Sequence, residues 1–376
     1  MDTQNKLGIL FLFIIVIFAF FSLTFIFDTS KNQVLSDEFH SSTITIISVG
    51  DIFIHQSVLD AVYDKQSKSH DFSPYFQEVA ADLQNADLAT CWFGGVLDSV
   101  GTYTGYPSFK SPQALAQTMK NAGFDIAFRT NHTMDYGEKG LRTTTAIFNK
   151  YNIEQIGAYI SEEQSRKIYV YEKDSLKVSF LSYTYGMNGI PIPKAWMVNL
   201  IDTVKIKQDI EQAKLISDFV IVALHFGEEY QRYPNQNQKR LVGKIEQYGA
   251  NLIIGSHPHV IQPVERINNI YIAYCLGNFF CGQRMRYCDA GVMLKYTIVK
   301  EKDSVYLKEI SYIPTWNAKY LEQNQYRFKI LPITKNTVID KENYPFLSDD
   351  NLKRMRQAYD ETVEHLDKPG LNFICQ

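Results

Sequence analysis

Residues 251–262 read NLIIGSHPHVIQ, an apolar run that stops at Gly255 and is followed by His257, Pro258 and His259. A short apolar run bounded by glycine is typical of a strand buried on both faces of a sheet. The proline stiffens the backbone between the two histidines, so both imidazoles of an extended loop can point to one place. An H-x-H pair alone is a weak signal, and hydrogen-bonded loop histidines are the competing interpretation.

Other strand-length apolar runs surround this stretch, at residues 43–49, 124–128, 219–224 and 271–276. Helical patterns at residues 203–216 and 236–248 separate the later ones. Strands that alternate with helices of this size predict an α/β fold whose sheet is buried on its faces. Ser111 followed by a proline predicts the start of a further helix, and Ser348 predicts the start of a last amphipathic helix.

Polar residues follow each predicted strand directly. They are Asp51, Asn131 with His132, His225, His257 with His259, and Asn278. Loops that leave the carboxyl ends of strands in α/β sheets gather at one edge, where ligands bind, so we expect these residues to converge. With His55, this group holds five of the eight histidines of the chain.

The chemistry of this group favours a metal site. A carboxylate, an amide and several neutral imidazoles form a mixed oxygen and nitrogen ligand set that suits a divalent ion such as Zn, Mn or Fe. A structural interpretation stays open beside it, in which Asp51 is an Asx-turn residue and Asn131 is a turn or capping amide.

The composition limits the partners. The chain of 376 residues has 45% hydrophobic residues and a net charge near −3, with no basic run that could follow a phosphate backbone. It is therefore a globular protein, and nucleic acid is not an expected partner.

The N-terminal residues predict a membrane anchor. Residues 7–27 carry no charge over 21 positions, which at about 1.5 Å per residue crosses a hydrocarbon core of about 30 Å. A cleaved signal peptide is the alternative, but its apolar part is shorter and ends in small residues. We therefore expect a tail (1–6), a single transmembrane helix (7–27) and a linker (28–42). The preferred orientation places the main domain outside the cytoplasm, at the cell membrane.

Six ordered motifs resemble a known family. They are SVGDIFIH, YTGYPSFKSP, GFDIAFRTNHTMDYG, ALHFGEEY, GANLIIGSHPHVIQPVE and AYCLGNFF. In this order they resemble the poly-gamma-glutamate capsule-biosynthesis (CapA-type) proteins, which are similar to calcineurin-like metallophosphoesterases. The resemblance implies a four-layer α/β/β/α sandwich at residues 43–335, with residues 336–376 as a C-terminal helical extension. It also implies a role in capsule or exopolymer biosynthesis, with an anionic cell-surface polymer or its precursor and capsule-assembly proteins as partners.

The resemblance also implies roles for single residues. Asp51, Asn131, His225, His257 and His259 match metal ligands, and His132 matches a catalytic histidine that acts near the leaving group. Arg129 and Asn278 are expected to bind substrate. Two metal ions about 3.5 to 4 Å apart would activate a water and neutralise phosphoryl oxygens.

Three positions depart from the family pattern. Trp92 and Gly94 stand where the family has an asparagine and a glutamate that contribute to the site, and Arg129 brings a cation near it. The loss of an acidic ligand weakens at least one metal position unless another residue, such as Asp87, supplies the acid. Two hypotheses follow: a metal-dependent hydrolase or transferase with an altered centre, or a catalytically degenerate protein that binds an anionic polymer or an assembly partner.

Overall fold

The computed structural model describes residues 41–367 and 373–376. The predicted tail and membrane anchor, and nearly all of the predicted linker, lie outside these residues. Within them, no helix is both long and apolar enough to cross a membrane.

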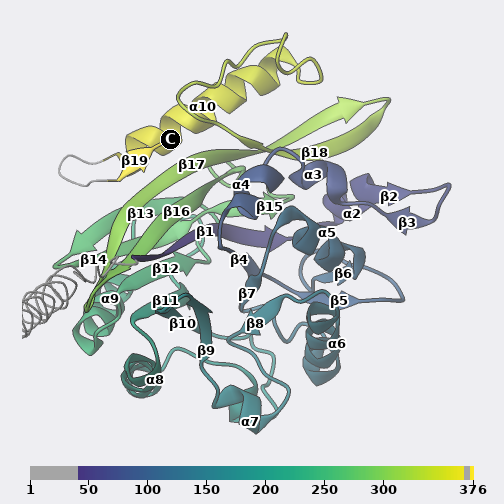
Figure 1. The fold of residues 1–376 in the computed structure, drawn as a ribbon. Coiled ribbons are helices and arrows are strands. Elements are labelled where there is room, and N and C mark those ends of the chain that lie inside the picture. The colour runs from purple at the N-terminus through teal and green to yellow at the C-terminus, as the bar shows by residue number, and fades with distance from the viewer. Residues whose placement is uncertain (1–40, 368–372) are drawn as a thin grey trace, which may run out of the picture. The chain divides into compact units, whose positions relative to one another are not determined.

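Two sheets form the centre of the fold (Figure 1). The large sheet has the spatial order β18 (Gln325–Pro332), β17 (Ser304–Glu322), β16 (Ala290–Glu301), β1 (Ser42–Phe53), β4 (Leu88–Phe93), β7 (Ile126–Arg129) and β8 (Glu154–Ile156). In addition, β15 (Asn278–Cys281) pairs with β1, and β19 (Ile374–Cys375) pairs with β17. The small sheet has the order β13 (Ile261–Ile267), β14 (Ile270–Leu276), β12 (Leu252–Ser256), β11 (Phe219–His225), β10 (Leu176–Thr184) and β9 (Tyr169–Lys173). Two short ribbons complete the strands: β2 (Tyr63–Asp64) with β3 (Ser69–His70), and β5 (Val96–Asp98) with β6 (Lys110–Pro112).

Helices connect these strands. They are α2 (Gln56–Val62), α3 (Ser73–Phe76), α4 (Ala80–Asn85), α5 (Ala114–Ala122), α6 (Gly137–Lys150), α7 (Glu162–Ser165), the 3-10 helix η1 (Ala195–Met197), α8 (Thr203–Ile216), α9 (Gln236–Tyr248) and α10 (Asp349–Leu366). The predicted boundaries of α8 and α9 are confirmed, and Ser348 caps α10 with the capping box that its position suggests. The helix start predicted at Ser111 is wrong, because this residue pairs in the ribbon of β5 and β6 and α5 begins only after Gln113.

Three cores define the layers. Alternate residues of β1 and β11, such as Ile46 and Ile221, meet in a core between the two sheets. The residues between them face outwards: Ile47 packs in a core with residues of α2 to α6, and Val222 packs in a core with residues of α8 and α9. This alternation is the two-residue period of a strand covered on both faces. The predicted mixed α/β fold is confirmed, with helices outside each of two facing sheets.

The last helix covers a part of the large sheet. Leu352, Met355 and Ala358 of α10 join the core between the sheets, and α10 runs along β17 (Figure 1, yellow). Arg354 of α10 holds Asp289, which lies just before β16, with distances of 2.7 and 2.9 Å between guanidinium nitrogens and carboxylate oxygens. The helix therefore packs on the main domain and is tied to the loop before β16.

Candidate functional site

The carboxyl ends of strands from both sheets meet at one place. Asp51 lies near the end of β1 and His225 ends β11, and their Oδ1 and Nδ1 atoms are 3.9 Å apart. The Nδ1 atom of His259 lies 3.3 Å from Oδ2 of Asp51. The ring centre of His257 is 4.9 Å from that of His225. The structure brings these four residues together, as the sequence predicts.

The loop between β12 and β13 orients its two histidines through an unusual backbone. His257 has a φ of 104° and His259 a φ of 59°, in the left-handed region that side chains other than glycine rarely adopt. Such conformations cost about 1–3 kcal/mol each and are found where surrounding structure holds them for a function. Both histidines are buried, with ring centres 6.1 Å apart. This loop places the imidazole of His259 beside Asp51 and that of His257 beside His225.

The polar atoms at the centre of this group lack partners. Asp51 is 0% exposed, and both of its carboxylate oxygens are without a hydrogen bond, as are Nδ1 of His225 and Nδ1 of His257. The 3.3 Å approach of His259 to Asp51 lacks hydrogen-bond geometry. A buried carboxylate without a partner is strongly destabilising. A bound cation would satisfy the unpaired lone pairs of these atoms.

The donor distances allow a metal only after small movements. Within the described residues, no group of three or more His, Cys, Asp or Glu side chains is arranged to hold a metal ion as it stands. Donor atoms around a tetrahedral ion with bonds of about 2.0–2.1 Å lie about 3.3 Å apart. Oδ1 of Asp51 and Nδ1 of His225 are 3.9 Å apart, slightly more than this value, whereas Nδ1 of His259 donates to Asn278, so His259 would bind an ion through Nε2. One carboxylate and three imidazoles therefore fit a divalent ion of the Zn, Mn or Fe class.

The surroundings keep two of the imidazoles neutral. Burial, reinforced by the neighbouring histidines, lowers the pKa of His257 to about 3 and that of His225 well below its ordinary value. For His259, burial lowers the pKa, but the contacts with Asp51 and Asn278 outweigh it and the net shift is upwards. His225 and His257 thus keep free lone pairs at neutral pH, as metal ligation requires.

Asn131 fixes the orientation of His225. Its Nδ2 donates to the hydroxyl of Tyr185 and to Oδ1 of Asn188, so its Oδ1 is the acceptor that faces Nε2 of His225 at 3.0 Å. The proton of His225 therefore lies on Nε2, and the lone pair of Nδ1 points to the side of Asp51. Asn131 therefore contributes to the histidine site through its hydrogen bond with His225.

His132 belongs to a separate pair at the rim of this group. Its Nδ1 lies 2.9 Å from Oδ2 of Asp135, which also accepts a hydrogen bond from the backbone nitrogen of Phe109. Nε2 of His132 accepts from Nδ2 of Asn188 at 3.2 Å. A carboxylate that holds one imidazole nitrogen leaves the other free for proton transfer. Sequence reasoning missed Asp135, although its spacing of three residues from His132 is a usable signal.

The segment that follows β10 covers the site. Tyr185, which is 46% exposed, lies with its ring centre 4.5 Å from that of His257. Its hydroxyl accepts a hydrogen bond from Nδ2 of Asn131 and donates one to Oδ1 of Asn188, which also accepts from Nδ2 of Asn131. Tyr185 and Asn188 were also missed, although they follow a strand end as the other site residues do.

Comparison with known proteins identifies the family. The family model described as "Bacterial capsule synthesis protein PGA_cap" matches residues 45–283. The chain belongs to this family.

Individual relatives agree with the family. The chain is 28% identical over 284 residues to the PGA biosynthesis protein CapA of Bacillus subtilis (strain 168), covering 73% of this chain and 71% of the relative. It is 26% identical to the capsule biosynthesis protein CapA of Bacillus anthracis, covering 64% of this chain and 60% of that protein. Among solved structures, the calcineurin-like phosphoesterase YfkN of Bacillus subtilis is similar at 14% identity and a TM-score of 0.45, covering 86% of this chain and 98% of that one.

The rings of Trp92 and Phe53 occupy the space in which the family resemblance predicts the side chains of an asparagine and a glutamate. Trp92 is fully buried, its ring centre lies 5.5 Å from that of His225, and its indole nitrogen has no partner. A Cβ atom at Gly94 would lie 2.0 Å from the Phe53 ring. That ring stands between His132 and His259, at 5.3 and 5.4 Å between centres. Aromatic carbon therefore fills the space beside Gly94.

The two residues expected to bind substrate have internal partners. Arg129 is buried against Phe93 and donates to the backbone oxygen of Gly95, while its Nε and Nη1 have no partner. Burial lowers its pKa to about 9. Asn278 accepts from Nδ1 of His259 at 3.0 Å and donates to the backbone oxygens of His259 and Cys288. In this conformation Asn278 orients His259.

Two other candidates lie apart from the group. Asp87 precedes β4, at the opposite end of the strand from the site, and binds Lys173 at 2.6 Å and the backbone nitrogen of Thr45. It does not supply the missing carboxylate. His55 stands just before α2 without a capping hydrogen bond from its side chain, accepts from the backbone nitrogen of Gly282 at 3.2 Å, and has its pKa lowered to about 4 by burial.

Proposed function

We propose that this capsule-family protein holds one divalent metal ion and acts as a hydrolase or transferase on a phosphoryl or acyl bond of a cell-surface polymer or its precursor. The observation that carries the proposal is the fully buried Asp51 carboxylate, which has no hydrogen-bond partner and is faced by His225, His257 and His259. In a protein without an ion this arrangement is destabilising, and a bound cation removes the penalty.

A single ion is favoured over the pair that the resemblance implies. The second position would need donors from the place of Trp92 and from a side chain at residue 94. Trp92 has no lone pair to offer a metal, and the ring of Phe53 occupies the space next to Gly94. With Asp51 as the one carboxylate, the charge of a second divalent ion would have no compensation.

The residues around this position suit a displacement at phosphorus or carbon. A bound metal would act there as a Lewis acid and lower the pKa of a water molecule. His132 would transfer a proton at Nε2, where Asn188 now donates to it, while Asp135 holds Nδ1 and fixes the orientation of the ring. Asn131 and Asn278 would keep His225 and His259 in their ligating orientations.

The location of this activity follows from the sequence. Residues 7–27 would anchor the chain in the cell membrane as a single span, with the main domain outside the cytoplasm. The capsule family supports an exopolymer as the substrate class and capsule-assembly proteins as partners.

Metal content tests the proposal. The full chain is purified in detergent without chelator, supplied with Zn or Mn, and its bound metal is measured by elemental analysis. We expect close to one ion per chain, and loss of this ion when His257 and His259 are both changed to alanine. Two ions per chain would contradict the single position. No ion would favour the catalytically degenerate alternative, in which the site only binds a polymer or partner.

A further inference from the structure

A large cavity lies apart from the histidine site. Its volume is about 1520 Å³, and it runs from β8 past α7 and β9 to α8, with residues of the segment before α8 on its wall. None of the candidate metal-site residues lines it. Pockets for single small molecules are usually about 300–1,000 Å³, so this space suits several units of an extended ligand.

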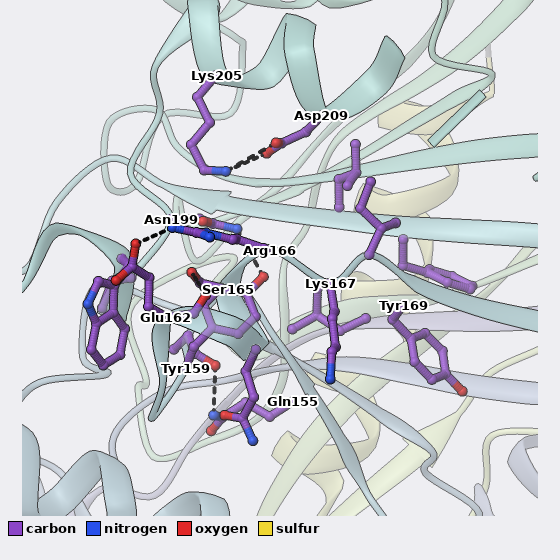
Figure 2. A pocket seen from close by; sticks show the side chains of 18 of the residues that line it. Gln155, Tyr159, Glu162, Ser165, Arg166, Lys167, Tyr169, Asn199, Lys205 and Asp209 are labelled. Carbon is purple, nitrogen blue, oxygen red and sulfur yellow. Dashed lines mark hydrogen bonds and ion pairs between the residues drawn. The ribbon is translucent and has the colours of Figure 1, made fainter. Parts of the chain in front are cut away.

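The residues that line the cavity include a buried amide with an unpaired oxygen. Gln155 of β8 is only 9% exposed and donates to Oγ1 of Thr145 and to the backbone oxygen of Ala158. Its Oε1 atom has no partner. A buried amide oxygen without a hydrogen bond costs about 1–3 kcal/mol, which a ligand that donates a hydrogen would recover. Close by, Asn199 donates to the hydroxyl of Tyr159 (Figure 2).

Aromatic rings line the same cavity. Tyr159, Tyr169 and Trp196 are half-buried and belong to its wall, and Lys194 lies 5.4 Å from the centre of the Trp196 ring. Rings that are partly open offer flat apolar faces beside polar edges, which is the surface that amphipathic ligands need.

The cations that line the cavity already have anionic partners, whereas the lining carboxylates of Glu154 and Asp202 form no ion pair among the described residues. Arg166 pairs with Glu162 at 2.5 Å, Lys205 pairs with Asp209 at 2.8 Å, and both pairs are visible in the cavity (Figure 2). Lys167 pairs with Glu163 at 2.6 Å. A polyanion such as a γ-glutamyl chain needs cations without such partners. An uncharged chain with many hydroxyl groups can instead bond to amides and carboxylates and place its apolar faces on the rings.

The cavity and the histidine site share one connecting segment. Residues 185–199 follow β10: Tyr185 and Asn188 contact the site, whereas Trp196 and Asn199 line the cavity. Met187 and Met197 of this segment pack with Met134, two residues beyond His132, in a small core of their own. A chain held in the cavity would therefore lie beside the segment that covers the site.

We propose that this cavity binds a segment of a neutral oligosaccharide, and that it serves as a glycan site separate from the metal centre. Trp196 and Tyr169 provide stacking faces, and Gln155 provides a hydrogen-bond acceptor. The proposal does not depend on whether the histidine site holds a metal, because no residue is common to both.

Binding of chitotetraose tests the glycan site. The full chain, in a detergent without a sugar head group, is titrated with chitotetraose and separately with tetra-γ-glutamate, using calorimetry and saturation-transfer NMR. We expect saturable binding of chitotetraose and at least tenfold weaker binding of tetra-γ-glutamate. Trp196→Ala should weaken chitotetraose binding at least tenfold, and Tyr169→Ala serves as a second variant should Trp196→Ala not fold.

Two controls separate this site from the rest of the molecule. Tyr306→Ala removes an aromatic ring that is 40% exposed on β17, outside the cavity, and should leave binding unchanged. The double variant His257→Ala and His259→Ala should lose metal but still bind chitotetraose. Absence of saturable binding, binding by both cavity variants as tight as that of the parent, or a preference for tetra-γ-glutamate would each overturn the proposal.

Discussion

Asp51 and Asp289 are both buried carboxylates, but their surroundings are opposite. Asp289 is 7% exposed and is held by the guanidinium of Arg354 and the indole nitrogen of Trp316, at 2.7 to 2.9 Å. Asp51 is 0% exposed, and no donor bonds to it. A fully bonded buried carboxylate contributes to the fold, whereas an unbonded one weakens the fold until a ligand arrives. This difference in hydrogen bonding distinguishes Asp289, a structural residue, from Asp51, a candidate ligand, without any comparison with related proteins.

The largest expected effect is at the structural carboxylate. Asp289→Ala leaves Arg354 without its main partner, and we expect the free energy of unfolding to fall by about 3 kcal/mol. Urea unfolding of the full chain in detergent, with and without metal, measures this loss. The loss should be the same in both conditions, and a loss confined to the metal-bound protein would mean that Asp289 acts through the site.

The carboxylate of Asp51, the candidate ligand, should behave in the opposite way. Metal at about one hundred times its dissociation constant should raise the free energy of unfolding by about 2.7 kcal/mol. Asp51→Asn should abolish this gain, while the metal-free variant should be at least as stable as the metal-free parent because a buried charge is removed. Thermal unfolding with and without Zn checks both signs. A destabilised metal-free variant would place Asp51 with Asp289 as a structural residue.

Gly94→Ala tests the filled space beside the site. The added methyl group would meet the ring of Phe53, and overpacking of this kind costs about 1–3 kcal/mol. The loss should shrink in a Phe53→Leu background. Gly243→Ala is the matched control, since nothing lies within 4 Å of its added Cβ and it lies inside α9. An equal change in the free energy of unfolding for Gly94→Ala and Gly243→Ala in the parent would show that the ring of Phe53 moves aside at little energetic cost.

The pH dependence of the metal-free protein should show the buried imidazoles. The folded-state pKa of His257 is about 3, below the 6.5 of an unfolded chain, so the unfolded state binds more protons between these values. Stability is therefore complete above about pH 6.5 and falls as the pH is lowered, by up to about 1.4 kcal/mol per pH unit for each such histidine. His257→Asn should have a shallower slope between pH 7 and 5 in urea unfolding. Parallel slopes would contradict the neutral state of His257.

The candidate site was largely predictable because its residues follow strand ends. Parallel strands bring their carboxyl ends to one edge, so His225, His257 and His259 could be grouped without knowing any distance. Asn188 could have been found in the same way, because it follows β10. However, the segment around it is rich in glycine and proline and contains no residue of a type that usually binds metal. The tautomer of His225 could not be foreseen, since it depends on which way the Asn131 amide points.

The role of the aromatic rings could not be predicted from the sequence. Trp92 and Gly94 were visible as departures, but which ring fills the vacated space depends on side-chain packing between β1 and β4. Phe53 lies two positions after Asp51, at the end of a strand whose last eight residues are all buried. Arg129 illustrates the same limit: its charge suggested a substrate contact, whereas its guanidinium lies against Phe93 and Gly95.

The position of β1 has a consequence for how the protein reaches its folded state. This strand carries Asp51 near the start of the described chain, yet one of its two main neighbours is β16, so that the hydroxyls of Ser48 and Tyr296 bond across 248 positions. Pairings between such distant segments form slowly, because a long loop must close first. During synthesis, Asp51 thus stays without its final surroundings until β16 has emerged, so the candidate site is completed only late in the synthesis of the chain.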